Sequence, residues 1–170
     1  GRAGDVGLLK RMGGFEVDGI PAVTIQGKPI SSTAIRLAVA RGDLPLAEEA
    51  LGRPYAVFGR VVPGRKLGRE LGCPTANIET DGFQLPPDGV YAVRVRIGEK
   101  TFAGVANLGV RPTVSRGDKR MLEVHLLAFE GDLYGLEIEV AFLRFLREEK
   151  KFGSMEELRA QIGRDVAAVR

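Results

Sequence analysis

From residue 55 onward, hydrophobic and polar residues alternate in short runs, which is the period of a β-strand with one buried face. The clearest run covers residues 90–97, in which the odd-numbered positions are apolar and both arginines occupy even-numbered positions. Gly98-Glu99 then reverses the chain into Thr101–Asn107, which predicts a hairpin. Further strand-like runs occupy residues 55–62, 121–129 and 136–146. Many short antiparallel strands with turns rich in glycine and proline predict a β-barrel or a β-sandwich.

The C-terminal segment changes to the period of an amphipathic helix. Ser154 and Glu157 have the spacing of a capping box, in which each side chain satisfies a backbone N–H group at the start of a helix. The apolar residues that follow at helical spacing are Met155, Leu158, Ile162, Val166 and Val169. We expect this side of the helix to pack on the barrel.

Residues 1–52 follow a different pattern. Glycines divide the first 20 residues into loops, and two short apolar runs, residues 15–17 and 22–25, are candidates for strands. One short helix is expected between a serine cap at position 31 or 32 and Gly42, and a second over residues 43–51. These elements make a poor independent core, so the region resembles the end of a larger domain or a docking extension.

Composition narrows the class of protein. The 170 residues are 44% hydrophobic and 28% charged, which is typical of a soluble globular protein with a real core. Cys73 is the single cysteine, and no apolar run is long enough to span a membrane, so we expect a cytoplasmic protein. The net charge of +3 is modest and scattered, which suits anionic small molecules at least as well as nucleic acids. His125 is the only histidine, which excludes catalytic sites that need two.

Glycine and basic residues are concentrated between Gly59 and Asn77. The glycines there are Gly59, Gly64, Gly68 and Gly72, and the cations among them are Arg60, Arg65, Lys66 and Arg69. Close backbone approach combined with positive charge is what a polyphosphate requires. The pattern matches neither a Walker A loop nor a dinucleotide fingerprint. A solvated connection is an equal alternative if these residues are taken alone.

Two oxygen-bearing side chains follow in Pro74-Thr75-Ala76-Asn77. In an extended segment Thr75 and Asn77 project to the same side, so their oxygens can converge on one hard cation such as Mg²⁺. A Thr-x-Asn turn with local backbone hydrogen bonds is the alternative, and the residues alone favour it.

Glu123 and His125 share one face of a strand whose other face is apolar. Glu123 is a candidate general base if that face lines a cleft, and otherwise a solvent-exposed strand residue. His125 fits a hydrogen-bonded structural histidine better than a catalyst. Further along, Phe152 lies among cations in residues 147–153, where it can cover a planar ligand by stacking or belong to a solvated loop.

An ordered series of motifs resembles the riboflavin kinase domain, from about residue 53 to the C-terminus. The motifs are Gly64…Gly68-Arg69-x-Leu71-Gly72-x-Pro74-Thr75-Ala76-Asn77, Gly89-Val90-Tyr91, Gly104-Val105-Ala106-Asn107-x-Gly109-x-Arg111-Pro112-Thr113, Glu123-x-His125-Leu126, Asp132-Leu133-Tyr134-Gly135 and Leu146-Arg147-x-Glu149-x-x-Phe152. Residues 30–36 resemble the end of the FMN adenylyltransferase domain that precedes this kinase in bacterial bifunctional FAD synthetases.

The resemblance implies a six-stranded antiparallel Greek-key barrel with a C-terminal helix, preceded by a small α/β remnant. It divides the chain into an adenylyltransferase remnant, residues 1–52, and a kinase domain, residues 53–170. The site residues that it implies are Glu123 as catalytic base, Thr75 and Asn77 for Mg²⁺, Gly64, Arg69, Thr75 and Tyr134 for ATP, and Arg147, Lys150 and Phe152 for the flavin.

The implied reaction is phosphorylation of riboflavin by ATP to give FMN and ADP. The adenylyltransferase needs a motif with two histidines, so FAD synthesis is expected of a full-length enzyme and not of this chain alone. No nucleic acid or membrane partner is expected. Two alternatives stay open: a non-catalytic basic barrel that binds single-stranded nucleic acid, and a flavin-binding fragment whose kinase activity requires the missing domain.

Overall fold

The computed structural model describes residues 6–19, 21, 23–25, 27–64, 74–111 and 119–169. The chain divides into two compact units, Gly1–Ser31 and Ser32–Arg170. Among the described residues, no helix is long and apolar enough to cross a membrane.

The first unit contains one helix and one small hairpin. Helix α1 spans Val6–Met12, where the sequence analysis predicted loops, and its last turn carries two basic residues that favour a helix C-terminus. Gly13 follows with a φ of 70°, a conformation in which glycine ends helices readily. Strands β1 (Thr24–Ile25) and β2 (Lys28–Pro29) pair with each other. The strand expected at residues 15–17 is absent from this described segment, so that prediction was wrong.

The second unit begins with two short helices, α2 (Ser32–Ala40) and α3 (Leu44–Leu51). Asp43 caps α3 by accepting a hydrogen bond from the backbone N–H of Leu46 at 3.2 Å. The two helices share a small buried cluster, and Tyr55 packs both on this cluster and on the barrel core. Both helices therefore belong to the same compact unit as the barrel. The division at residue 52 into a remnant and a kinase domain stays a prediction.

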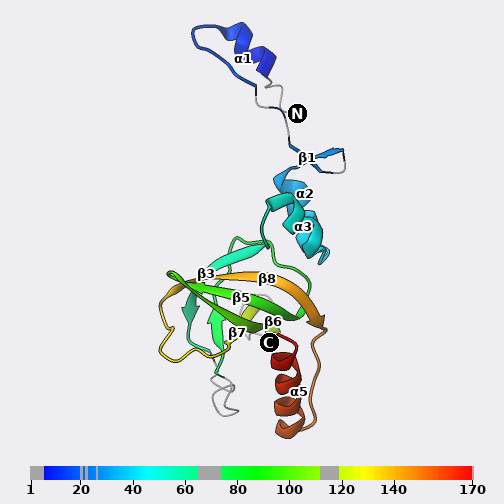
Figure 1. The fold of residues 1–170 in the computed structure, drawn as a ribbon, viewed down its shortest axis with the longest axis vertical. Coiled ribbons are helices and arrows are strands. Elements are labelled where there is room, and N and C mark those ends of the chain that lie inside the picture. The colour runs from blue at the N-terminus through cyan, green and yellow to red at the C-terminus, as the bar shows by residue number, and fades with distance from the viewer. Residues whose placement is uncertain are drawn as a thin grey trace. The chain divides into compact units, whose positions relative to one another are not determined.

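Six antiparallel strands form a closed barrel in the second unit (Figure 1). The strands are β3 (Ala56–Val62), β4 (Ala76–Ile78), β5 (Gly89–Ile97), β6 (Lys100–Arg111), β7 (Lys119–Leu126) and β8 (Glu137–Arg147). Their order around the barrel is β3-β4-β7-β6-β5-β8, so β4 neighbours β7 and β5 neighbours β8. The predicted six-stranded antiparallel barrel is confirmed.

The alternation along β5 decides which side chains enter the core. Tyr91 and Val93 are 1% and 0% exposed, whereas Arg94 and Arg96 lie on the outside. The Tyr91 ring meets the Phe142 ring edge to face at a centroid distance of 5.3 Å. A strand with this period places its polar residues on the outer surface of the barrel, which is where a site can form.

Helix α5 (Met155–Ala167) follows the last strand. Ser154 Oγ accepts a hydrogen bond from the Glu157 N–H at 3.2 Å, as the capping box predicted. The Glu157 carboxylate accepts from the Gly153 N–H at 3.0 Å. Leu158 and Ile162 are half-buried, but Met155 is 46% exposed, so the apolar side of the helix begins later than predicted.

Candidate active site

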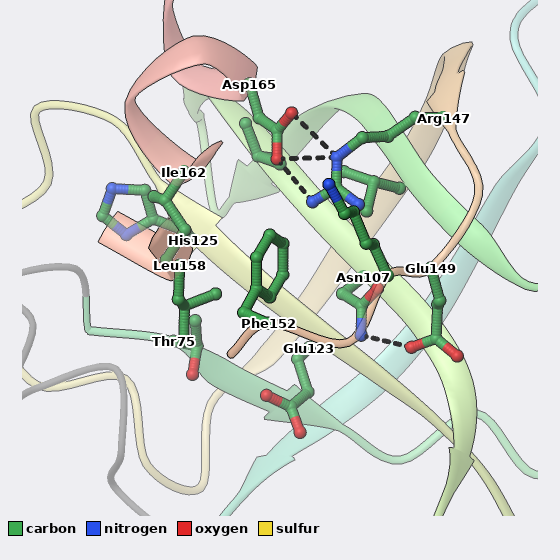
Figure 2. Close-up of a pocket in the computed structure, with 13 residues that line it drawn as sticks. Thr75, Asn107, Glu123, His125, Arg147, Glu149, Phe152, Leu158, Ile162 and Asp165 are labelled. Carbon is green, nitrogen blue, oxygen red and sulfur yellow. Dashed lines mark hydrogen bonds and ion pairs between the residues drawn. The ribbon is translucent and has the colours of Figure 1, made fainter. Parts of the chain in front are cut away.

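A pocket of about 310 Å³ lies where the outer face of the barrel meets α5 and the segment before it (Figure 2). Its lining residues are Thr75, Val90, Val105, Asn107, Glu123, His125, Arg147, Glu149, Lys150, Phe152, Leu158, Ile162 and Asp165. This volume is at the lower end of the range for small-molecule sites. We call it the main pocket.

Strand register aligns three polar side chains on the barrel wall. Asn77 on β4 is opposite Glu123 on β7, which in turn is opposite Asn107 on β6. Directly opposed residues of antiparallel strands project to the same face, so the three side chains form one row. Their neighbours Leu122 and Val124 are both fully buried on the inner face. The period of the strand therefore directs Glu123 outward, as the sequence predicted.

Asn77 is 3% exposed, and its Oδ1 atom has no hydrogen-bond partner within the described residues. An orphaned buried oxygen is costly and needs a reason, such as a bound ion. A Cβ atom at Gly64 would collide with the Asn77 amide nitrogen, so glycine lets the end of β3 lie directly against this side chain. Thr75, two residues before Asn77, lines the main pocket.

A second pocket of about 100 Å³ adjoins the first through Thr75, which lines both. Its other lining residues are Val61, Pro74, Ala76, Leu126, Phe129, Gly131, Asp132, Leu133 and Tyr134. Tyr134 is 43% exposed, and its backbone N–H donates to Asp132 Oδ1 at 3.0 Å, which fixes the turn that carries it. The two pockets therefore meet at one hydroxyl-bearing residue.

Arg147 is held by α5. Its Nε and Nη2 atoms donate to the Asp165 carboxylate at 3.0 Å and 2.8 Å, and Asp165 is buried. Gln161 also donates to Asp165, at 2.8 Å. Bidentate pairing of this kind fixes the plane of a guanidinium group. Arg147 thus lines the pocket with its charge neutralised and its orientation fixed by Asp165.

Phe152 lines the main pocket close to two cations. The Arg147 guanidinium carbon and the Lys150 ammonium nitrogen each lie 5.9 Å from the Phe152 ring centroid. Both distances are within the range of cation–π contacts. In Figure 2 the ring lies between the Arg147–Asp165 pair and the end of the pocket that holds the Thr75 hydroxyl and the Glu123 carboxylate.

Several lining residues had no predicted role. Asn107 Nδ2 donates to Glu149 Oε1 at 2.8 Å, and the Glu149 carboxylate lies so close to Gly109 that a Cβ atom there would collide with it. Asn107, Gly109 and Glu149 all belong to the motifs that carry the family resemblance, so those motifs could have identified them as site residues. Nothing in the sequence around Asp165 predicts a role in a site, because a single acidic residue near the end of a helix is usually solvated.

The structure locates all of the predicted site residues except Arg69. Glu123, Thr75, Arg147, Lys150 and Phe152 line the main pocket, Tyr134 and Thr75 line the second, and Gly64 and Asn77 pack on each other. Arg69 lies outside the described residues, as does most of the glycine-rich loop. Across the described residues, no three His, Cys, Asp or Glu side chains form a metal-binding group.

The chain is similar in sequence to known proteins. Two bifunctional riboflavin kinase/FMN adenylyltransferases, from Pseudomonas fluorescens and Escherichia coli strain K12, are each 48% identical to this chain. The alignments cover 99% and 100% of this chain and 55% of each relative. The chain therefore spans about half the length of the curated relatives it matches.

Solved structures share the fold. A crystal structure described as a macrolide-efflux protein from Streptococcus pneumoniae has a TM-score of 0.81 at 35% identity, covering 95% of this chain and 53% of the other. The riboflavin kinase from Trypanosoma brucei has a TM-score of 0.51 at 26% identity, covering 69% of this chain and 78% of the other.

The riboflavin kinase family model matches residues 51–170, which contain every element of the barrel and α5. The match confirms the resemblance stated from the motifs. The chain belongs to the riboflavin kinase family.

Proposed function

We propose that this chain transfers the γ-phosphoryl group of ATP to the terminal ribityl hydroxyl of riboflavin, giving FMN and ADP. The observation that carries the proposal is that Thr75 lines both pockets, with Glu123 in the larger one. Two substrates that occupy these pockets would meet beside a hydroxyl and a carboxylate. The main pocket, which contains Phe152, suits the flavin, and the pocket beside Tyr134 suits the nucleotide.

Glu123 is the proposed general base. The new bond forms between the ribityl oxygen and the γ-phosphorus, while the bond from that phosphorus to the β,γ-bridging oxygen breaks and ADP leaves. Glu123 accepts the hydroxyl proton and later releases it to solvent. Phosphoryl transfer depends mainly on positioning and charge stabilisation, so the base assists a reaction that the pockets organise.

Mg²⁺ is the proposed metal, with Thr75 and Asn77 as its protein ligands. The orphaned Asn77 Oδ1 fits this role, because a hard cation accepts carbonyl oxygens and Mg²⁺ commonly uses few protein ligands alongside water and phosphate oxygens. When bound, the ion would neutralise charge on the transferred group. Gly64 supports the site by leaving room for the Asn77 side chain.

Arg147, Lys150 and Phe152 are the proposed flavin contacts. An aromatic ring with two cations close to it offers a flat, polarised surface for a planar heterocycle. Arg69 would serve ATP from the glycine-rich loop, as the family resemblance implies.

The test is incubation of the chain with riboflavin, ATP and Mg²⁺, followed by chromatography for FMN, FAD and ADP. We expect FMN and ADP in equal amounts and no FAD. ADP release that does not depend on riboflavin, or no FMN at all, would reject the proposal. Dependence on the missing domain would appear as riboflavin binding without FMN. A gel shift with single-stranded nucleic acid checks the other alternative, since phosphate-driven binding weakens steeply with salt.

The full-length enzyme would also adenylylate FMN to FAD, as the names of the relatives indicate. Riboflavin and ATP are the partners that the proposal requires, and it assigns neither nucleic acid nor a membrane surface to the chain. A cytoplasmic location also stays a prediction.

A further inference from the structure

His125 lies on the same strand face as Glu123 and lines the main pocket, yet the proposed reaction gives it no task. Its Nδ1 atom is 2.9 Å from the carbonyl oxygen of Pro74, the residue immediately before Thr75. A carbonyl oxygen only accepts hydrogen bonds, so Nδ1 must carry the proton and donate.

The strand that carries the proposed metal ligands is weakly anchored by its backbone. Strand β4 has three residues, and its register with β7 pairs Ala76, Asn77 and Ile78. Its register with β3 pairs only Asn77 and Ile78. Thr75 lies one residue before the first paired position, so neither register fixes it.

The hydrogen bond from His125 anchors the peptide immediately before Thr75. It joins β7 to the peptide that links Pro74 and Thr75, and it thereby continues the β4–β7 connection past the end of the backbone ladder. Thr75 is also the one residue that lines both pockets among the described residues of each. A small displacement of its hydroxyl would separate the two substrates, and misplacement of about 1 Å can cost about 100-fold in rate.

We propose that His125 is a positioning residue that holds Thr75 at the junction of the two pockets through the Pro74 carbonyl. The inference rests on the proposed function, because Thr75 matters only if phosphoryl transfer occurs there. His125 acts through its Nδ1–H group and makes no contact with the transferred phosphate.

The first test reads the ring directly. His125 is the only histidine in the chain, so the imidazole signals of the ¹⁵N-labelled protein have a single source. A neutral imidazole carries its proton on one of its two nitrogens, and in a free neutral histidine this is mostly Nε2. We expect the protein to show the proton on Nδ1. A proton on Nε2 would overturn the proposal, whatever the activity.

The second test compares two amide substitutions. Asparagine places its NH₂ group near the position of Nδ1, whereas glutamine reaches the position of Nε2. We expect His125→Asn to retain activity within about threefold and His125→Gln to lose about 10-fold or more in kcat. Riboflavin affinity without nucleotide, measured by flavin fluorescence, should change little in either variant.

Three outcomes would overturn the role. Activity near the wild-type value in both variants would mean that the Nδ1 donor is dispensable. Loss of riboflavin affinity that matches the loss of activity would make His125 part of the pocket wall. A wild-type chain that makes no FMN would remove the proposed function together with this role, whereas the first two outcomes would leave the proposed function intact.

Discussion

Single side chains carry the chemistry proposed for this chain, and each is constrained differently. Glu123 is directed outward by the period of β7, in line with Asn77 and Asn107. Asn77 is buried, and its Oδ1 atom has no hydrogen-bond partner among the described residues, an arrangement that costs free energy unless a ligand binds there. A buried polar atom without a hydrogen-bond partner indicates a role in binding or catalysis rather than in packing.

Replacing Glu123 with glutamine removes the proton acceptor while preserving the shape of the side chain. We expect kcat to fall by about 10²- to 10⁴-fold, because that is the usual contribution of a general base. Riboflavin affinity should stay near the wild-type value. Steady-state kinetics and fluorescence titration measure the two effects, with Glu99→Gln in the exposed β5–β6 turn as the matched control. Near-normal turnover in Glu123→Gln would exclude the base role.

Asn77→Ala removes the oxygen proposed to bind Mg²⁺. We expect a higher Mg²⁺ concentration for half-maximal activity at saturating ATP, because the ion loses one of its few protein ligands. A Mg²⁺ titration of FMN formation measures this directly, and chemical denaturation verifies that the variant is folded. An unchanged titration midpoint would contradict the assignment.

The helices and strands decide how rigidly these residues are held. Helix α5 forms a wall of the main pocket through Leu158 and Ile162, and it fixes Arg147 through Asp165. The cap at Ser154 is reinforced by the next acid: the backbone N–H of Glu156 and the Ser154 hydroxyl lower the pKa of the Glu156 carboxyl. The shape of the main pocket therefore depends on the stability of α5.

Substitution of two glycines that have open space around them tests how backbone conformation contributes to stability. A Cβ atom at Gly163 in α5 or at Gly52 after α3 would meet nothing within 4 Å, but Gly52 has a φ of +69°. Gly163→Ala should raise the free energy of unfolding by about 0.5–1 kcal/mol, because alanine favours a helix interior. Gly52→Ala should lower it, because alanine is strained at positive φ. Denaturant titrations with the same sign for both variants would contradict this account.

The whole molecule depends on the closure of the barrel around its core. Tyr91 is central to that core, with its ring against Phe142 and Phe145 and its hydroxyl donating to the Pro87 carbonyl at 2.6 Å. Burial raises the pKa of Tyr91 to about 12, above its ordinary value of 10.0. The folded protein therefore holds this proton at a pH where the unfolded chain releases it.

The resulting pH dependence has a definite sign. Between pH values of about 10 and 12 the unfolded state binds fewer protons than the folded state, so the free energy of unfolding falls as pH rises. Burial also raises the pKa of Tyr55, which adds to the fall. Tyr91→Phe should make this decline less steep than in the wild type. Denaturation midpoints across this pH range measure the effect, and equal slopes for wild type and Tyr91→Phe would exclude Tyr91 as its source.

Much of the barrel follows from local sequence. The alternation in β5 predicted which residues are buried, since the side chain of each strand residue is directed by a period of two. The spacing of Ser154 and Glu157 likewise located the start of α5. The first unit was harder to predict. Its several glycines predicted loops, whereas Val6–Met12 forms a helix.

The residue types needed for phosphoryl transfer, and the faces of the strands on which they lie, were thus readable from the linear chain. Their meeting in space was not. Thr75 immediately precedes β4, whereas Glu123 lies on β7 and Asp165 on α5. They share one pocket because barrel closure and helix packing join segments that are distant in sequence. The pairing of Arg147 with Asp165 and the anchoring of Pro74 by His125 depend on such long-range contacts, which no local period encodes.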